Sequence, residues 1–591
     1  MSFLPINKKE MEDRGWIAPD FVFVSGDAYV DHPSFGVAIL TRLLEAEGYK
    51  VCVLAQPDWK DTESFKIFGK PKYGFFISGG VIDSMVNHYT VNKVHRKKDV
   101  YSPGGSTHKR PDRAVTVYSN KIRQAYGQIP IVIGGIEASL RRFSHYDYWE
   151  DKIKHSILID SQADLLIYGM GERTIIEVAK ALEMGHGEAL YNIRGTSYVL
   201  PENKLPETIK AFLMTDKSDD KNFVLLNSYE SLLKDKKAYI KNFLTQSREN
   251  DPVYGRCLLE KVQYKYVIQN PPQFPLSVEE ADRVYALPFE RTWHPVYDKE
   301  GGIEALKEVE FSITSHRGCF GSCNFCALTY HFGRRIVKRS EASILREAKI
   351  LTKSPRFKGY IHDLGGPTAN FRNIACDKQV KYGVCKDRQC MFPKLCPNLK
   401  VSHREYLDIL RKLRKLDKVK KVFIRSGIRF DYLMADKDDT FFNELCKYHI
   451  SGQLKVAPEH FSDNVLKYMG KCPHSVYENF KEKYNRVNKK LGKKQYLVPY
   501  LMSSHPGSSM KDALKMKEML KGDFIPEQVQ DFYPTPSTLS TLMYYTEMDP
   551  FTFKKIYVAK TPQEKKAQRD LLSKKSSNHK SQNRGAKHHK G

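Results

Sequence analysis

Three closely spaced cysteines are the clearest chemical feature of the sequence. Cys319, Cys323 and Cys326 follow one another as C-x3-C-x2-C, in a loop that also carries glycines and phenylalanines. A [4Fe–4S] cluster usually takes four cysteine thiolates as ligands. Because this loop supplies only three, one iron would stay open to a small molecule. Zinc is the competing interpretation, but zinc sites usually combine one close cysteine pair with a second, distant pair.

A second set of cysteines lies further along the chain, in a Lys-rich segment. Its members are Cys376, Cys385, Cys390 and Cys396. Four thiols in so short a segment predict a second metal site, but their irregular spacing matches neither a zinc pattern nor an iron–sulfur pattern, so zinc and iron–sulfur both stay open. Such clustering indicates metal ligation in a reducing compartment and not a disulfide framework.

Composition and charge define the class of protein. The 591 residues are enough for more than one domain. No apolar run reaches the ~18 residues of a membrane span, and the N-terminal residues lack the apolar core of a signal peptide, so we expect a cytoplasmic protein with no membrane segment. The net charge of +27 favours contact with nucleic acid. A solvated, Lys-rich surface explains the same charge.

The N-terminal part of the sequence alternates between strand-like and helix-like patterns. The predicted strands are 21–24, 51–55, 74–78, 131–134 and 164–168, and helical periodicity covers 35–47 and 174–184. This alternation predicts an α/β domain with a doubly wound, Rossmann-like parallel sheet over residues 1–195. Ligands of such sheets lie beyond the carboxyl ends of the strands. Residues 196–295 have no such clear pattern and are expected to be a linker or insertion.

The alternation returns after the linker. Strand-like segments occur at 310–314, 359–364, 421–425, 453–457, 495–501 and 528–532, with helical segments between them. Six strand–helix units predict a partial (β/α)6 barrel over residues 296–540, with its chemistry at the carboxyl ends of the strands. Residues 541–591 form a C-terminal extension. Its end, residues 560–591, is polar and basic and is predicted to be disordered.

Polar and Gly-rich segments follow the predicted barrel strands. The candidate ligand-binding residues among them are Gly365, Gly366, Arg425, Ser426, Glu459 and His460. The two glycines allow the backbone to approach a ligand closely. Arg425 and Ser426 are suited to a ribose or a carboxylate, whereas Glu459 and His460 are suited to ligand binding or proton transfer.

The cysteine loop and these rim segments resemble the radical S-adenosylmethionine (SAM) superfamily. With the segments at 456–460, 496–500 and 528–536, the chain resembles the bacterial YgiQ-type family, which has a cobalamin-binding-like N-terminal domain. The resemblance implies that Cys319, Cys323 and Cys326 hold a [4Fe–4S] cluster whose open iron binds SAM. It also implies reductive cleavage of SAM to a 5′-deoxyadenosyl radical, and an electron donor such as flavodoxin or ferredoxin. In the superfamily, the aromatic residue at the position of Phe325 lies near the adenine of SAM. The backbone at the positions of Gly365 and Gly366 contacts the SAM amino group.

Cobalamin is a further cofactor to consider for such an N-terminal domain. Its base-off binding motif is D-x-H-x-x-G, but here Asp31 and His32 are adjacent and His32 precedes Gly36 by four positions. The motif is not met, so the sequence does not favour cobalamin. The substrate stays open. The alternatives are an enzyme that modifies RNA or the ribosome, and a non-catalytic iron–sulfur or zinc protein that binds nucleic acid.

Overall fold

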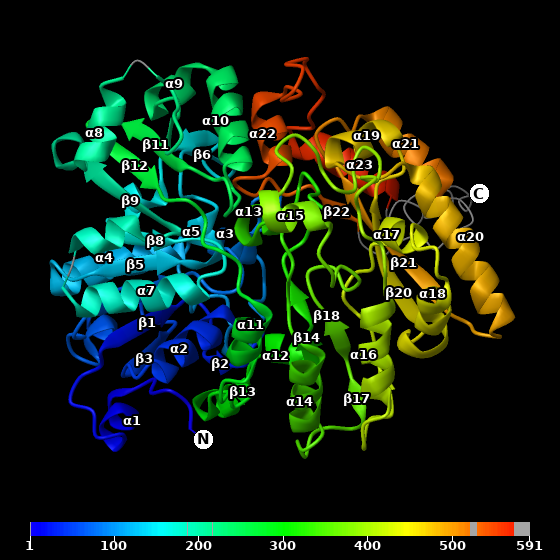
Figure 1. The fold of residues 1–591 in the computed structure, drawn as a ribbon, viewed down its shortest axis with the longest axis horizontal. Coiled ribbons are helices and arrows are strands. Elements are labelled where there is room, and N and C mark those ends of the chain that lie inside the picture. The colour runs from blue at the N-terminus through cyan, green and yellow to red at the C-terminus, as the bar shows by residue number, and fades with distance from the viewer. Residues whose placement is uncertain (1, 186, 216, 521–528, 573–591) are drawn as a thin grey trace, which may run out of the picture.

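Two α/β units lie side by side in the computed structural model, which describes residues 2–185, 187–215, 217–520 and 529–572. Figure 1 shows the N-terminal sheet, coloured blue to green, on the left, and the barrel, coloured green to orange, on the right. The predicted class, a doubly wound domain followed by a partial barrel, is confirmed. Among the described helices, none has the length and apolar character that a membrane crossing requires.

The N-terminal sheet is built on five parallel strands. In sheet order they are β3 (Val51–Ala55), β1 (Phe21–Ser25), β4 (Gly74–Ser78), β5 (Ile131–Gly134) and β8 (Leu165–Ile167). Alternate residues of each strand face opposite helix layers. Phe21 and Phe23 pack towards α2 (Gly36–Ala46) and α7 (Glu172–Glu183), whereas Val22 and Val24 pack towards α4 (Ala114–Tyr126). The strand order changes direction between β1 and β4, which is where doubly wound sheets bind ligands.

The same sheet continues beyond residue 195. Four more strands extend it: β9 (Thr196–Pro201), β12 (Lys265–Gln269), β11 (Cys257–Val262) and β10 (Phe223–Leu225). β9 is antiparallel to β8, and β12 is antiparallel to both β9 and β11. The segment expected as a linker or insertion therefore supplies strands to the N-terminal sheet, although the boundary between domains stays a prediction.

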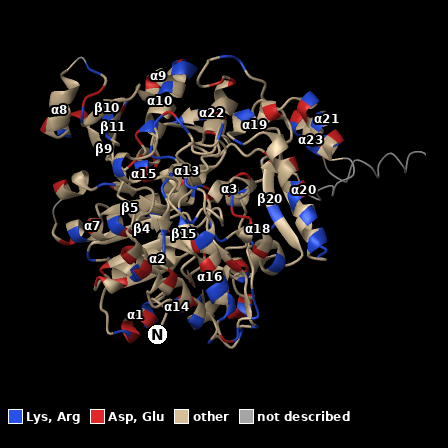
Figure 2. Ribbon diagram, turned by 45° about the vertical axis from the view of Figure 1, so that its right-hand side comes forward, with Lys and Arg blue, Asp and Glu red and all other residues tan. Residues whose placement is uncertain are grey.

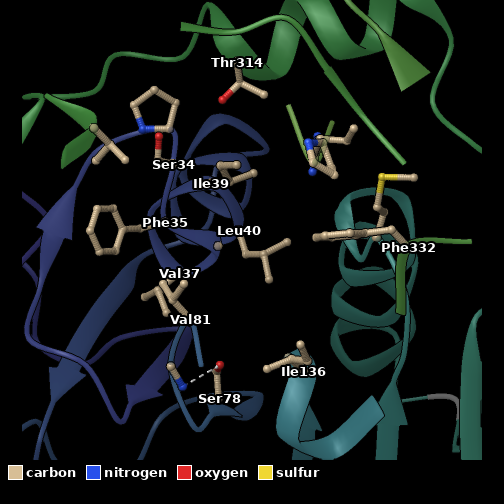
Figure 3. A pocket seen from close by; sticks show the side chains of 18 of the residues that line it. Ser34, Phe35, Val37, Ile39, Leu40, Ser78, Val81, Ile136, Thr314 and Phe332 are labelled. Carbon is tan, nitrogen blue, oxygen red and sulfur yellow. Dashed lines mark hydrogen bonds between the residues drawn. The ribbon is translucent and has the colours of Figure 1, made fainter. Parts of the chain in front are cut away.

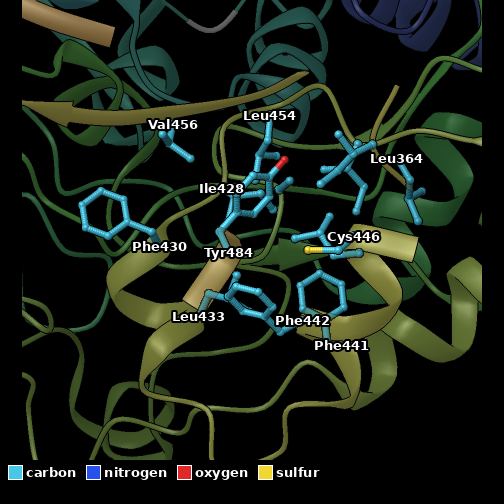
Figure 4. Close-up of a cluster of buried hydrophobic side chains, with 14 of the residues drawn as sticks. Leu364, Ile428, Phe430, Leu433, Phe441, Phe442, Cys446, Leu454, Val456 and Tyr484 are labelled. Atoms are coloured by element: carbon cyan, nitrogen blue, oxygen red, sulfur yellow. The ribbon is translucent and has the colours of Figure 1, made fainter. Parts of the chain in front are cut away.

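All six predicted barrel strands are present. They are β14 (Ser312–Thr314), the broken second strand β17 (Tyr360–Ile361) and β18 (Asp363–Gly365), β19 (Lys421–Val422), β20 (Gln453–Glu459), β21 (Tyr496–Ser503) and β22 (Gln530–Asp531). The strands pair in parallel with their neighbours, except that β19 and β20 are connected only by the parallel bridge between Ile428, in the segment after β19, and Val456 of β20. Figure 4 shows the apolar side chains that pack between these strands and the outer helices, among them Leu454, Phe441 and Phe442.

The sequence pattern predicts one helix over 463–491 and one over 229–246, and the structure divides each of them into two helices. The stretch 463–491 forms α19 (Asp463–Met469) and α20 (His474–Lys490), because Gly470 ends the first helix in a left-handed conformation and Pro473 precedes the second. The stretch 229–246 forms α9 (Tyr229–Lys234) and α10 (Lys236–Arg248), because the Asp235 side chain caps the start of α10.

The prediction of disorder from residue 560 is wrong for its first part. Residues Pro562–Leu572 form helix α23, which packs against α21 (Met510–Met519) and β21. Leu572 and Gln568 are almost fully buried, and Gln568 exchanges hydrogen bonds with Ser508. Tertiary burial thus stabilises a helix whose composition alone predicts a solvated chain. Residues 573–591 lie outside the described residues.

The contact between strand β20 and the outer helices generates a stability prediction. Leu454 is 1 % exposed and Leu514, on the outer side of α21, is 46 % exposed. Leu454→Ala should lower the free energy of unfolding of the barrel by about 2–5 kcal/mol, because it removes buried methyl groups and leaves a cavity. Leu514→Ala should change it by less than about 0.5 kcal/mol. Urea unfolding followed by far-UV circular dichroism measures both, and equal effects would contradict this packing.

Candidate functional site

A cavity of about 840 Å³ lies between the N-terminal sheet and the barrel. Its size is that of a typical ligand pocket. Figure 3 shows Thr314 of the barrel on the opposite side of this space from Ser78 and Ile136 of the N-terminal domain. The carboxyl ends of β1, β4, β5 and β8 and those of β14 and β18 all open into it. Both domains therefore direct the ligand-binding end of their sheets at the same space.

The barrel side of the cavity is polar. Its lining includes Thr314, Asp363, Ser426 and Lys455, which come from different strands or the loops that follow them. Asp363 accepts hydrogen bonds from the backbone N–H groups of Arg425 and Ser426 and from the Ser426 hydroxyl. Burial raises the pKa of the Asp363 carboxyl against the opposing effect of these bonds. Lys455 makes no ion pair with any described residue, so its ammonium group is available to a ligand.

Gly365, which ends β18, and Gly366, which follows it, both line the cavity, and both lie close to neighbouring side chains. A methyl group on Gly365 would clash with the side chains of Asp363 and Ser426. A methyl group on Gly366 would lie 2.6 Å from the imidazole ring of His316. The glycines therefore make room for these neighbouring side chains.

The N-terminal side of the cavity combines a polar base with apolar walls. Ser25, Asp27 and Ser78 lie at the ends of β1 and β4, and Leu40, Ile136 and Phe332 are among the apolar residues around them. Asp27 forms an ion pair with the buried Arg110 at 2.8 Å. Burial nevertheless raises the pKa of Asp27 to about 6, because it outweighs the attraction of the guanidinium group.

The cysteine loop lies at the edge of this cavity. His316 and Arg317 immediately before it, and Leu328, His331 and Phe332 in helix α13 (Ala327–Phe332) immediately after it, all line the cavity. Arg317 also forms a buried ion pair with Glu172 of the N-terminal domain.

Asn324, between the second and third cysteines, fixes the loop to three other segments. Its side chain donates to the carbonyl of Tyr468 at 2.9 Å and accepts from Gln389 at 3.0 Å, and its carbonyl accepts from the N–H of Ser540 at 2.9 Å. The loop is therefore held by α19, by the segment that carries the second cysteine set, and by α22 (Leu539–Thr546).

A buried arginine lies against the cysteine thiols. Arg429 forms two hydrogen bonds with the carboxylate of Asp431, at 2.9 and 2.6 Å, and its remaining terminal nitrogen donates to the sulfur of Cys323 at 3.4 Å. Burial opposes ionisation of Asp431, but the guanidinium group outweighs it and holds the pKa of that carboxyl below its usual range. A positive charge at this place favours thiolate over thiol.

The loop fits a cluster with three protein ligands. Burial, and to a smaller extent the neighbouring thiols Cys323 and Cys319, raises the pKa of Cys326 to about 12. A methyl group on Gly321 would meet Arg429 at 2.5 Å and the sulfur of Cys319 at 3.3 Å, so the backbone here must stay bare. Within the described residues, no three His, Cys, Asp or Glu side chains are grouped tightly enough to hold a single metal ion. A [4Fe–4S] cluster does not require that grouping, since each thiolate binds a different iron.

The other predicted residues do not face the cavity. Phe325 packs in an apolar cluster with its ring edge towards His505, and Glu459 forms a buried pair with Lys471 at 3.8 Å. His460 accepts a hydrogen bond from the N–H of Ser462. His32 is fully buried and accepts from the N–H of Ser34. Of the predicted rim residues, the cavity therefore brings together only Gly365, Gly366, Arg425 and Ser426.

Sequence reasoning missed Lys455 and Arg429. The alternation of burial along β20 places Gln453 and Lys455 on the cavity side and Leu454 and Val456 on the helix side, so the strand pattern could have indicated Lys455. Nothing local marks Arg429, because its partners Asp431 and Cys323 are brought together only by the fold.

Figure 2 shows basic and acidic segments intermixed on most of the visible elements, with basic segments along α20. Binding of nucleic acid stays a prediction.

Comparison with known proteins identifies the family. Residues 3–312 match the family model "Radical SAM N-terminal", residues 313–520 match "Radical SAM superfamily", and residues 527–590 match "Domain of unknown function (DUF3362)". A "UPF0313 protein" of Clostridium botulinum (strain Loch Maree / Type A3) is 57 % identical over 574 residues, which cover 97 % of this chain and 87 % of that protein. The chain belongs to the UPF0313 family of radical SAM proteins.

A second relative agrees with this membership. "UPF0313 protein CPE1196" of Clostridium perfringens (strain 13 / Type A) is 55 % identical over 572 residues, with 96 % of this chain and 84 % of that protein covered.

Among solved structures, the radical SAM methyltransferase TsrM from Kitasatospora setae, with tryptophan and a SAM analogue bound, is 14 % identical to this chain. The match covers 88 % of this chain and 74 % of that one, with a TM-score of 0.46.

Family membership confirms the main functional prediction. The chain is a radical SAM enzyme, and the cofactors of this superfamily are a [4Fe–4S] cluster and SAM. The non-catalytic alternative is therefore set aside. The assignment of individual ligands, the second metal site and the electron donor stay predictions. Cobalamin stays an alternative. His32, the histidine of the 31–36 segment, would not be its ligand, because His32 is fully buried and does not line the cavity.

The close packing at Gly365 generates a prediction for this radical SAM enzyme. Gly365→Ala should weaken SAM binding at least about tenfold, because the new methyl group displaces Asp363 and Ser426 and such overpacking costs about 1–3 kcal/mol. Gly427→Ala is the matched control, since a methyl group there meets no atom within 4 Å. Equilibrium dialysis with labelled SAM on cluster-loaded protein measures both. Unchanged binding by Gly365→Ala would contradict the placement of SAM at this rim.

Proposed function

We propose that this enzyme binds a [4Fe–4S] cluster through Cys319, Cys323 and Cys326 and cleaves SAM reductively in the adjoining cavity. The observation that carries the proposal is the continuity of the cysteine loop with the cavity wall. His316 and Arg317 on one side of the loop, and the residues of α13 on the other, line the same space. A cofactor held by the loop would therefore lie beside whatever the cavity binds.

Held by Cys319, Cys323 and Cys326, the cluster would supply the electron that cleaves the carbon–sulfur bond of SAM, which would give methionine and a 5′-deoxyadenosyl radical able to abstract hydrogen from a substrate. The protein orients the reactants and keeps water away from the radical. The Lys455 ammonium group would supply a cation for the carboxylate of SAM, and the Ser426 oxygen, whose proton is donated to Asp363, would accept a hydrogen bond from a ribose hydroxyl. His316 donates from Nε2 to the carbonyl of Thr368 and accepts from Ser315 at Nδ1. Burial lowers its pKa to about 3, so the ring is neutral and serves as a fixed wall of the site.

The N-terminal side of the cavity is the proposed substrate side. Its apolar walls and its polar base at Asp27 and Ser78 suit a molecule with an apolar body and a polar end. The radical would form on the barrel side and meet this molecule across the cavity. An electron donor of the flavodoxin or ferredoxin class is expected to reduce the cluster.

The ligand assignment can be tested by removing one thiol. Cys323→Ala should lower the iron content of anaerobically reconstituted protein by about four atoms per chain, because the loop would retain only two ligands. The same variant should form no 5′-deoxyadenosine when it is reduced in the presence of SAM. Cys257→Ala, which removes a thiol from β11 in the N-terminal sheet, should keep both iron and activity. Full iron content in Cys323→Ala would refute the assignment.

The role of Lys455 generates a separate prediction. Lys455→Met should raise the dissociation constant of SAM about tenfold, the loss expected for one charge-assisted hydrogen bond, while the iron content stays unchanged. Lys421→Met is the control, because Lys421 is also an exposed strand lysine but does not line the cavity. SAM binding and iron content are measured on the same samples. A loss of iron together with affinity would show that Lys455 acts through the cluster site and not on SAM.

A further inference from the structure

We propose that Cys376, Cys385, Cys390 and Cys396 bind a second iron–sulfur cluster, and that this cluster passes electrons to the cysteine loop at 319–326. The site itself follows from the packing of the segment that carries these cysteines. Its role in electron transfer rests on the function proposed above.

The second cysteine set is gathered into one compact loop. Cys376 precedes α15 (Asp377–Tyr382), and the N–H of Cys396 donates to the carbonyl of Cys390 at 2.9 Å. The amide of Gln379 donates to the sulfur of Cys390 at 3.7 Å. Cys376 and Cys396 both lie near enough to Cys390 to affect its thiol electrostatically. The loop thus places Cys376, Cys390 and Cys396 in the same neighbourhood, with an amide donor of the kind that stabilises cluster sulfurs.

Neighbouring residues hold this loop in place. Arg334, just after α13, donates to the carbonyls of Cys385 and Arg388 at 2.9 and 2.7 Å. From the N-terminal domain, Asp251 accepts from the N–H of Val384 at 3.1 Å, and Tyr254 donates to the carbonyl of the same residue at 2.9 Å. These contacts order a segment that has little secondary structure of its own, as a preformed metal site requires.

The arrangement favours a cluster over zinc. A zinc site built from four cysteines needs every sulfur about 2.3 Å from one ion. No three His, Cys, Asp or Glu side chains in the described part of the chain are grouped closely enough for that. The same is true of Cys319, Cys323 and Cys326, in the loop that matches the superfamily's cluster motif. In a cluster each thiolate binds a separate iron, so sulfurs that converge without meeting at one point suit it.

The second site lies directly against the first. Cys390 and Met391 share an apolar cluster with Cys319, Phe320 and Phe371. The rings of Phe320 and Phe371 are stacked with their centroids 3.9 Å apart. The hydrogen bond between Gln389 and Asn324, noted above, joins the residue before Cys390 to the middle of the first cysteine loop. At least one thiol of each set, Cys319 and Cys390, therefore packs against the same apolar cluster.

The outer surface of the second loop is basic. Its exposed basic residues are Lys378, Lys381, Lys386, Arg388 and Lys394. Asp377 and Asp387, the acidic residues of this segment, pair with Lys400 at 2.6 Å and with Arg248 at 3.2 Å. This surface is complementary to an acidic one-electron carrier. The carrier would lose one electron to the second cluster, which would return to its oxidised state by passing that electron to the first cluster. No bond or proton changes in this relay.

Metal analysis of the full-length protein tests the site. Anaerobically reconstituted protein should hold about eight irons per chain if both clusters are [4Fe–4S]. Cys390→Ser should lose about half of the iron and keep SAM binding, whereas Cys323→Ala should lose the other half. Cys385→Ser serves as a second variant if Cys390→Ser does not fold. About four irons in the unmodified protein, or bound zinc that Cys390→Ser removes, would overturn the second cluster.

The relay is tested by changing the reductant. With dithionite, a small reductant that reaches either cluster, Cys390→Ser should form 5′-deoxyadenosine at a rate within about threefold of the unmodified protein. With reduced flavodoxin its rate should fall at least about tenfold. Lys386→Glu should also slow the flavodoxin reaction, more strongly at low salt, whereas Lys70→Glu on the N-terminal domain should not. Equal effects with both reductants would overturn the relay. Absence of 5′-deoxyadenosine in every sample would instead refute the proposed function.

Discussion

A barrel of six parallel strands leaves one side of its interior uncovered, and the rest of this molecule is arranged around that opening. Among the described strands, β22 does not pair with β14, so the barrel stays open. Its interior strand positions carry polar side chains such as Thr314 and Lys455. The N-terminal sheet covers the opening with the carboxyl ends of its own strands. The cavity is therefore the space that two incomplete surfaces enclose together, and neither domain alone would form it.

Burial of charge is the second constraint on the site. Four charged side chains lie close behind the cysteine loop: Arg429, Asp431, Glu459 and Lys471. Arg429 pairs with Asp431 and Lys471 with Glu459, so the set is neutral without the thiols. The Arg429 guanidinium also reaches the sulfur of Cys323, which gives a thiolate there a partner inside a low-dielectric environment. An unpaired buried anion would otherwise be strongly destabilising. The loop is thus prepared for anionic sulfur by residues more than 100 positions away in sequence.

The sequence predicted features that depend on local patterns. Six barrel strands, the parallel core of the N-terminal sheet and the cysteine motif were all recognised, because strand periodicity and ligand spacing are local properties. The break after Met469 was missed, although it is local too, since a glycine followed three positions later by a proline ends a helix. Features that depend on distant partners were missed. The pairing of Arg429 with Cys323, the burial of α23 and the close contact of Gly365 with Ser426 all involve residues that only the tertiary structure brings together.

Contacts around the cavity fix its two sides relative to each other. Before the barrel, Arg291 pairs with Glu347 of α14 (Glu341–Leu351) at 2.7 Å, and at the cysteine loop Arg317 pairs with Glu172.

Near the C-terminus, the buried Lys565 of α23 donates to the hydroxyls of Tyr148 in the N-terminal domain and Tyr544 of α22, at 2.9 and 3.1 Å. Burial lowers the pKa of Lys565 to about 8. These attachments come from three separate parts of the chain, so the distance between the polar and apolar sides of the cavity is set by the fold. In the proposed mechanism, a radical formed on the barrel side would reach only the atoms that this fixed distance allows, so the position of a bound molecule would decide which of its atoms react.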